Sequence, residues 1–347
     1  MFRFNLKKLF VFSFPIILFG SFLFPGSIFL RKINNIIFNK FNYSKNSKPI
    51  YNNKSDFDNA HNYLLTLAKG FKKENNLVNK ALSLPIDFNQ INIEKIETIQ
   101  EGKLDFDITY RTYEVTTNNG FQFYYLEVFN NYLDIDKNLL FLHGNTCSPD
   151  ALLGFEKGRF SDPVAIELAK SGIRVIVPLK YDMYKNNFSS QVTINSALYG
   201  TTLESLEQIK IRVLTQKYSK DNRKISIYGF SHGAWQALIA SQLNEYRTLF
   251  FHDLLVPPEK FIKSLSFYTD YDSSILELYD YGYLFEKANA ENINILIGNS
   301  SKYYYPKEVK KITNNKKKYP KLKISIYEGG HFISSSLILK HISSLNW

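Results

Sequence analysis

From Asn138 onward the chain alternates short, fully apolar runs with segments of helical periodicity. Apolar strands separated by helices are typical of a parallel sheet that is covered on both faces. The pattern therefore predicts an α/β domain with a mostly parallel central sheet and helices on both faces. The apolar runs are Leu139–Leu142, Ile173–Pro178, Ile225–Tyr228, Leu249–His252, Ile293–Ile297 and Leu322–Tyr327. The helical segments are Pro163–Lys170, Thr201–Lys217, Gly233–Leu243 and Lys307–Ile312.

A hairpin is expected before this alternation. Phe106–Val115 and Gln122–Val128 carry alternating β-branched and aromatic residues around the turn sequence Asn118-Asn119-Gly120. Together with the apolar runs, the hairpin predicts a sheet of about eight strands in a domain spanning residues 96–347. Residues 31–95 are expected to form a linker and a helical stalk, because polar residues dominate their first part and helical spacing follows.

The first 30 residues form a separate segment. Leu9–Leu30 is an uncharged stretch of 22 residues, and about 20 apolar residues span a bilayer as a helix. We therefore expect a single-pass membrane anchor, and a cleaved signal peptide followed by secretion is the alternative. Basic residues are nearly balanced on the two flanks, so the sequence does not assign the side of the membrane on which the rest of the chain lies.

The distribution of charge excludes one class of partner. The formal net charge is +11, but the first 55 residues carry nine basic side chains and no acidic one. Nine more lysines, with Glu308 alone among them, lie between Lys302 and Lys323. Nucleic-acid binding needs a continuous basic surface, which the rest of the chain does not supply. The lysine cluster is expected to be solvated, with contact to anionic lipid as the alternative. The single Cys147 excludes an intramolecular disulfide.

The first motif is Gly229-Phe230-Ser231-His232-Gly233, which directly follows an apolar run and directly precedes a helical segment. This is the G-x-S-x-G pattern in the strand, turn and helix context that it requires. The flanking glycines leave room for a strained turn that exposes the serine hydroxyl, and the helix dipole favours negative charge at that point. The motif predicts Ser231 as a nucleophile.

The second motif is His143-Gly144-Asn145, after the run Leu139–Leu142. A nucleophilic serine needs two N–H donors where the oxygen of a tetrahedral intermediate forms. We expect these donors to be the backbone N–H groups of His232 and Asn145. The side chain of His143 is then expected to hold the loop through hydrogen bonds.

The third motif is Glu328-Gly329-Gly330-His331, after the last apolar run. Serine is a poor nucleophile without a base, and histidine suits that task. His331 follows a late strand and two glycines that free the loop, so it is the predicted general base. His61 and His341 are expected to be surface or packing residues, and His232 to line the pocket.

In the order His-Gly, G-x-S-x-G, Gly-His, these motifs resemble those of the α/β-hydrolase family over about 250 of the 347 residues. The resemblance is to serine esterases and dienelactone-hydrolase-like members. It implies an acyl-enzyme mechanism without a cofactor or metal ion, in which Ser231 attacks a carbonyl and His331 transfers the proton. Haloalkane dehalogenases share the His-Gly-Asn turn, but their nucleophile is an aspartate, so Ser231 argues against that chemistry.

The third member of the triad departs from the family pattern. The family usually places an aspartate after the seventh strand, where this chain has Asn299-Ser300-Ser301-Lys302. Some members take the acid from the end of the sixth strand, and Asp253 directly follows the run Leu249–His252 there. The sequence favours Asp253. Three further hypotheses stay open: Asp270 or Asp272 as the acid, an uncharged arrangement in which Asn299 or Ser301 orients His331, and a Ser-His dyad without a third member.

Two functions remain after these steps. The first is a membrane-tethered serine hydrolase that acts on a small or lipid-like carboxylic ester. The alternative is a non-catalytic binding or scaffolding protein of the same fold, which the missing aspartate near Ser301 favours. Aromatic residues in Pro257–Asn292 and the loop Tyr181–Tyr199 form either an acyl pocket or part of the core. The sequence predicts neither the acyl specificity nor an oligomeric state.

Overall fold

The fold is taken from a computed structural model of the chain. The chain divides into two units, and all of the residues described below belong to the unit Pro49–Trp347. The predicted membrane segment, Asn145, Asp270, Asp272 and the loop Tyr181–Tyr199 lie outside the described residues. The structure describes residues 82, 84–85, 87–105, 107–133, 137–144, 149–155, 163–180, 201–219, 224–256, 281–331 and 334–343.

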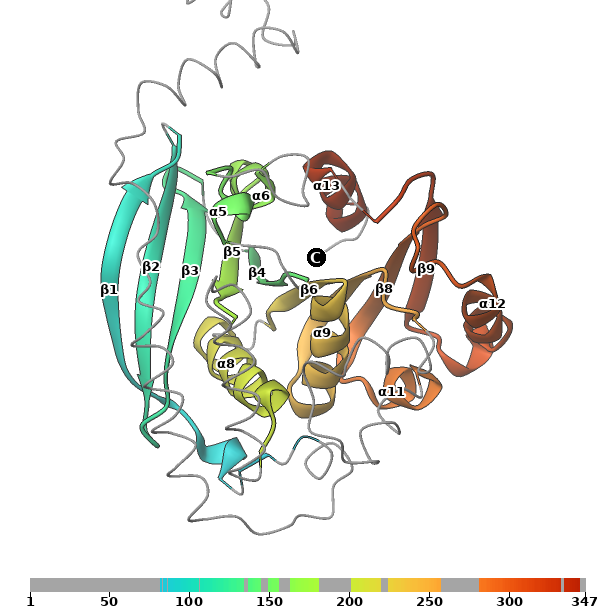
Figure 1. The fold of residues 1–347 in the computed structure, drawn as a ribbon, viewed down its shortest axis with the longest axis horizontal. Coiled ribbons are helices and arrows are strands. Elements are labelled where there is room, and N and C mark those ends of the chain that lie inside the picture. The colour runs from blue at the N-terminus through green and yellow to red at the C-terminus, as the bar shows by residue number, and fades with distance from the viewer. Residues whose placement is uncertain are drawn as a thin grey trace, which may run out of the picture. The chain divides into compact units, whose positions relative to one another are not determined.

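A nine-stranded sheet organises the domain, with the order β1-β2-β3-β5-β4-β6-β7-β8-β9. Figure 1 shows it running from β1 at the left to β9 at the right. The strands β4 to β9 are parallel to one another, whereas β1, β2 and β3 pair antiparallel. The strands are β1 (Ile93–Lys103), β2 (Ile108–Thr117), β3 (Gln122–Asn130), β4 (Lys137–Leu142), β5 (Ile173–Pro178), β6 (Ser226–Phe230), β7 (Tyr246–His252), β8 (Ala290–Gly298) and β9 (Leu322–Tyr327).

The mostly parallel sheet and the hairpin β2–β3 are confirmed, and β1 is the strand that the sequence did not predict. In β1 the isoleucines recur every third residue, at Ile93, Ile96 and Ile99, so the alternation of a strand is missing. The structure explains this spacing. The pairing of β1 with β2 shifts register between Ile93 and Lys95 and between Thr98 and Gln100, and each irregularity changes which face the next side chain takes.

Each of the four predicted helices is present, with ends within two residues of the expected ones. α9 is buried along nearly its whole length, because it is apolar on all sides. α8 begins at a Thr202 cap, whose hydroxyl accepts from the Ser205 N–H at 3.1 Å. The helices are α5 (Pro149–Leu152), α6 (Val164–Lys170), α8 (Leu203–Tyr218), α9 (His232–Leu243), α11 (Tyr281–Lys287), α12 (Pro306–Asn314) and α13 (Ser335–Ser343), with short 3₁₀ turns η1 (Phe88–Gln90) and η4 (Lys316–Lys318).

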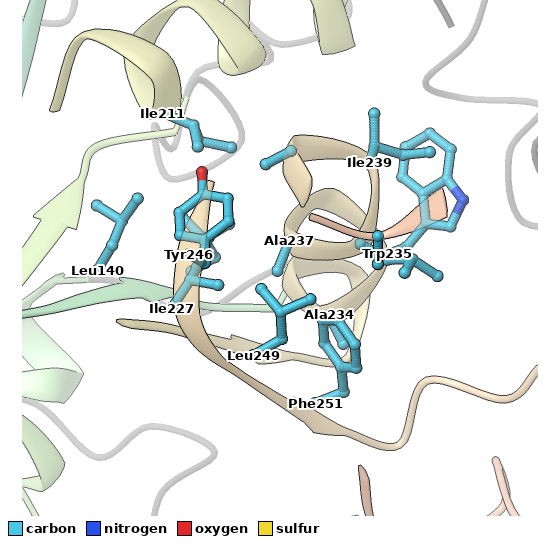
Figure 2. Close-up of a cluster of buried hydrophobic side chains, with 14 of the residues drawn as sticks. Leu140, Ile211, Ile227, Ala234, Trp235, Ala237, Ile239, Tyr246, Leu249 and Phe251 are labelled. Atoms are coloured by element: carbon cyan, nitrogen blue, oxygen red, sulfur yellow. The ribbon is translucent and has the colours of Figure 1, made fainter. Parts of the chain in front are cut away.

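Two hydrophobic cores lie on the two faces of the sheet. In β4, Leu140 and Leu142 enter the core that holds α8, α9, α11 and α12, while Leu139 and Phe141 enter the core that holds α6 and α13. This alternation is the two-residue period of a strand buried on both faces. Figure 2 shows part of the first core, where Leu249 of β7 lies beside α9. Both cores pack against the strands whose carboxyl ends carry the site described next.

The lysine cluster lies on the outer surface of α12, η4 and the start of β9. All nine of its lysines are exposed, as expected for a solvated surface. An open groove of about 520 Å³ lies there, between α12 and β9, and Val309, Ile312 and Ile324 are among its lining residues. None of the predicted site residues lines this groove. Within the described part of the chain, no helix is long and apolar enough to cross a bilayer.

Candidate active site

Ser231 occupies the turn between β6 and α9, at the carboxyl end of a central strand. Its backbone has φ 56° and ψ −120°, which is a conformation that residues with a side chain rarely adopt. The backbone N–H of Ser231 donates to the carbonyl of His252 at 3.0 Å, which ties the turn to the end of the neighbouring strand β7. A serine on a strained strand-to-helix turn is the arrangement that the G-x-S-x-G motif predicts.

Glycines flank Ser231 because the backbone there passes too close to its neighbours for a side chain. A Cβ atom on Gly233 would lie 2.1 Å from the carbonyl oxygen of Leu142, the last residue of β4. A Cβ atom on Gly229 would lie 2.4 Å from the carbonyl oxygen of Gly233. Non-bonded atoms normally stay about 3.5 Å apart. The two glycines therefore allow α9 to begin directly against the end of β4.

Asp253 and His331 form a close pair at the same edge of the sheet. Nδ1 of His331 lies 2.6 Å from Oδ2 of Asp253, a hydrogen bond of the short, charge-assisted kind. The Asp253 side chain is fully buried. Its Oδ2 also accepts from the hydroxyl of Ser301 at 2.7 Å, and its Oδ1 faces the N–H of Gly298 at 3.3 Å. These hydrogen bonds offset the free-energy cost of removing the carboxyl group from water.

Two aromatic rings fix the plane of the His331 imidazole. Phe230, the last residue of β6, stacks on it with ring centroids 4.7 Å apart. The ring of Tyr303 meets it edge-on, with centroids 4.4 Å apart. Because Phe230 directly precedes Ser231, this stack places the imidazole over the end of the strand that carries the candidate nucleophile.

Strand register explains why the three residues gather at one edge. β6 and β7 are adjacent and parallel, and Phe230 of β6 pairs with His252 of β7. Ser231 and Asp253 are the next residues of these two strands, so both leave the sheet at its carboxyl edge. His331 reaches the same edge from the loop after β9. Loops at the carboxyl ends of parallel strands are where open α/β sheets place their ligand sites.

The loop after β4 lies on the other side of Ser231. A Cβ atom on Gly144 would lie 3.0 Å from the Cβ of Ser231, so the two backbones are in close approach. Nδ1 of His143 lies 2.8 Å from the carbonyl oxygen of Gly144, and since a carbonyl only accepts, Nδ1 carries the proton. Nζ of the buried Lys180 donates to the carbonyl of His143 at 2.6 Å. These two bonds hold the loop, which is the role expected for His143.

Both histidines beside this loop are neutral. Burial, and then the charge of Lys180, hold the pKa of His143 and of His232 well below the ordinary value. His232 is the first residue of α9, and the leading N–H groups of a helix have no acceptor within the helix. The N–H of His232 is among these leading groups, which is the position in the chain that the predicted oxyanion donor requires. Asn145, the other predicted donor, lies outside the described residues.

The structure brings Asp253, the favoured acid, into contact with His331. Ser301, one of the uncharged candidates, contacts Asp253 rather than His331. Asn299 accepts from the N–H of Gly329 through its side chain and so braces the histidine loop. His341 lies on α13 and packs edge-on against a phenylalanine of β7, as expected for a packing residue. No group of metal-ligating side chains occurs among the described residues.

Sequence reasoning missed three residues that support this site: Lys180, His252 and Tyr327. Lys180 lies two residues after the predicted strand Ile173–Pro178. Its position at the carboxyl end of a parallel strand is the sequence feature that could have identified it. His252 and Tyr327 are the final residues of predicted apolar strands. No pattern in the sequence indicates that these two side chains meet across β8.

Comparison with solved structures identifies the fold. An acetyl xylan esterase from Paenibacillus sp. R4 has a TM-score of 0.52 at 14% identity, over 82% of this chain and 99% of that chain. A putative acetyl xylan esterase from Bacteroides fragilis NCTC 9343 has a TM-score of 0.51 at 10% identity, over 82% of this chain and 79% of that chain. No protein-family model matches the sequence, and no curated protein matches it either. The chain has the α/β-hydrolase fold, which the resemblance of its three motifs predicted.

The close approach at Gly233 makes a prediction about folding. We expect Gly233→Ala to be strongly destabilising, because its methyl group would overlap the backbone of β4. Gly330 is the matched control from the histidine motif, since nothing lies within 4 Å of a Cβ atom placed there. Thermal unfolding of the two variants measures the difference. Equal melting temperatures would contradict the packing described for the turn.

Proposed function

We propose that the chain is a serine hydrolase that cleaves carboxylic esters through an acyl-enzyme. The observation that carries the proposal is the 2.6 Å pair between His331 and Asp253, at the edge of the sheet where the strained Ser231 turn lies. Ser231 is the nucleophile, His331 the general base and Asp253 the acid that orients it. The backbone N–H groups of His232 and Asn145 are the oxyanion donors.

The proposed reaction has two halves. In the first, Oγ of Ser231 attacks the ester carbonyl while Nε2 of His331 takes the hydroxyl proton, and the charge on the carbonyl oxygen is stabilised by the oxyanion donors. His331 then gives the proton to the leaving alcohol. In the second half, water gives a proton to Nε2 of His331 as its oxygen attacks the acyl carbonyl. His331 then returns that proton to Oγ of Ser231 as the bond between Oγ and the acyl group breaks, which releases the acid and restores Ser231.

Asp253 supports an enzyme over the non-catalytic alternative. That alternative drew on the missing carboxylate beside Ser301. Asp253 supplies a carboxylate from the neighbouring strand, and Ser301 donates to it. Because the carbonyl of His143 and the N–H of Ser231 are also engaged in hydrogen bonds, the loops around the proposed oxyanion are held in place before substrate binds. Preorganised donors of this kind lower the barrier more than flexible ones.

A probe reaction tests the triad. We expect a fluorophosphonate to label the full chain at Ser231, and we expect Ser231→Ala and His331→Ala to abolish the labelling. Asp253→Asn should lower kcat for p-nitrophenyl acetate by about 10⁴-fold, because the imidazole loses its orientation and its support when charged.

Asp105→Asn is the control for a lost carboxylate, since Asp105 lies at the surface in an ion pair with Lys170. A folded wild-type chain that never reacts with the probe would contradict the hydrolase proposal. Full activity of Asp253→Asn, in a chain that Ser231→Ala inactivates, would show that another group fills the acid role.

We further propose that Leu9–Leu30 tethers the chain to a membrane, on the basis of its length and lack of charge. Alkaline extraction of the expressing cells should leave the full chain in the membrane fraction, and deletion of residues 1–30 should release it. The intact mass of the mature protein is the deciding measurement. A mass that lacks the N-terminal residues would support the cleaved signal peptide and contradict the anchor.

A further inference from the structure

His252 links two tyrosines inside the domain, close to the proposed triad. Its side chain is fully buried at the end of β7. Nε2 of His252 lies 3.0 Å from the hydroxyl of Tyr327, the last residue of β9. Nδ1 lies 3.5 Å from the hydroxyl of Tyr228 on β6. The imidazole therefore spans three strands just below the carboxyl edge of the sheet.

The direction of the hydrogen bonds follows from one carbonyl group. The Tyr327 hydroxyl donates to the carbonyl oxygen of Gly330 at 2.5 Å. Since that proton is used, the Tyr327 oxygen accepts from His252, and Nε2 carries the imidazole proton. Nδ1 is then an acceptor for Tyr228. Burial lowers the pKa of His252 to about 4, so the ring is neutral at neutral pH with the single proton that this arrangement needs.

The main chain of His252 connects to two members of the proposed triad, Ser231 and Asp253. Its carbonyl oxygen accepts from the N–H of Ser231 at 3.0 Å. Its carbonyl carbon begins the peptide bond to Asp253. Through Tyr327, its side chain reaches Gly330, whose carbonyl belongs to the peptide unit that leads into His331. His252 is thus linked to the backbone that carries each of the three side chains, directly for Ser231 and Asp253 and through Tyr327 for His331.

The ring of Tyr327 also packs against the backbone of the loop that leads to His331. A Cβ atom on Gly329 would lie 2.7 Å from Cε2 of Tyr327, and one on Gly298 would lie 3.0 Å from its Cζ. The loop therefore passes directly over the ring. The N–H of Ser300 donates to the carbonyl of Gly329 at 2.9 Å, so the loop is held from the side as well.

We propose that the His252–Tyr327 hydrogen bond is a positioning device for the proposed triad, which holds the His331 loop at a fixed distance from the β6 and β7 ends that carry Ser231 and Asp253. The inference rests on the proposed function. Neither residue touches the reacting atoms. Their effect is to keep the imidazole aligned with Asp253 and with the end of β6 that carries Ser231, because catalysis is sensitive to displacements of about 1 Å.

Tyr327→Phe tests the device, because it removes only the hydroxyl and keeps the ring under the loop. We expect kcat for p-nitrophenyl acetate to fall about 10-fold to 100-fold, as for other small misplacements of catalytic groups, with KM unchanged. Tyr246→Phe is the matched control. Tyr246 is a buried tyrosine at the opposite end of β7, and its hydroxyl bonds to Thr215 at 3.0 Å. We expect it to keep full kcat.

Variants of His252 separate positioning from packing. An amide nitrogen of glutamine occupies nearly the place of Nε2 and donates as it does, so His252→Gln should retain most of kcat. His252→Leu fills the space but donates nothing, and it should lose as much kcat as Tyr327→Phe. In the double variant of Tyr327→Phe and His252→Leu, the two losses should not add, since both remove the same bond.

All measurements use the full chain, with melting temperatures recorded for every variant. Full kcat in Tyr327→Phe or His252→Leu, or an equal loss in Tyr246→Phe, would overturn the inference. A loss in His252→Gln as large as that in His252→Leu would overturn it as well, because the bond would then not be what matters. These outcomes are distinct from failure of the proposed function, in which the wild-type chain would show no activity that depends on Ser231.

Discussion

A buried carboxyl group constrains the whole carboxyl edge of the sheet. Asp253 has no contact with solvent, and a carboxylate removed from water costs several kcal/mol unless donors surround it. Three donors meet it here, from His331, Ser301 and the backbone of Gly298. They come from the last residue of β8 and from the loops after β8 and β9, so satisfying this one group fixes the position of both loops against β7.

The rest of the fold serves to bring these loops together. The paired register of β6 with β7 places Ser231 and Asp253 at the same level of the sheet, and Gly298 lies at the adjacent end of β8. Gly233 and Gly229 allow the helix after Ser231 to press against β4 without a gap. A buried helix and two cores pack against the sheet below this edge, and packed elements of this kind position site residues more precisely than loops do.

Much of this could be predicted from the sequence, because the central strands are buried on both faces and so are apolar throughout. β1 was missed because two register shifts disturb its alternation. The order of strands across the sheet could not be predicted, since no local pattern says which strands are neighbours. For this reason the sequence left Asp253, Asp270 and Asp272 open as the acid, and it did not predict the contact between His252 and Tyr327. Ser301 shows the same limit: it stands where the family usually has its aspartate, and only the packing of β7 beside β8 shows that it donates to one.

The proposed chemistry depends on the 2.6 Å hydrogen bond between Nδ1 of His331 and Oδ2 of Asp253, at the edge of the sheet that carries Ser231. The most direct measurement is the far-downfield proton NMR spectrum of the full chain. We predict a resonance from the Nδ1 proton of His331 that is present in the wild type and in Asp105→Asn and is lost in Asp253→Asn and His331→Gln. A folded wild-type chain without such a resonance, or one whose resonance survives Asp253→Asn, would contradict the account.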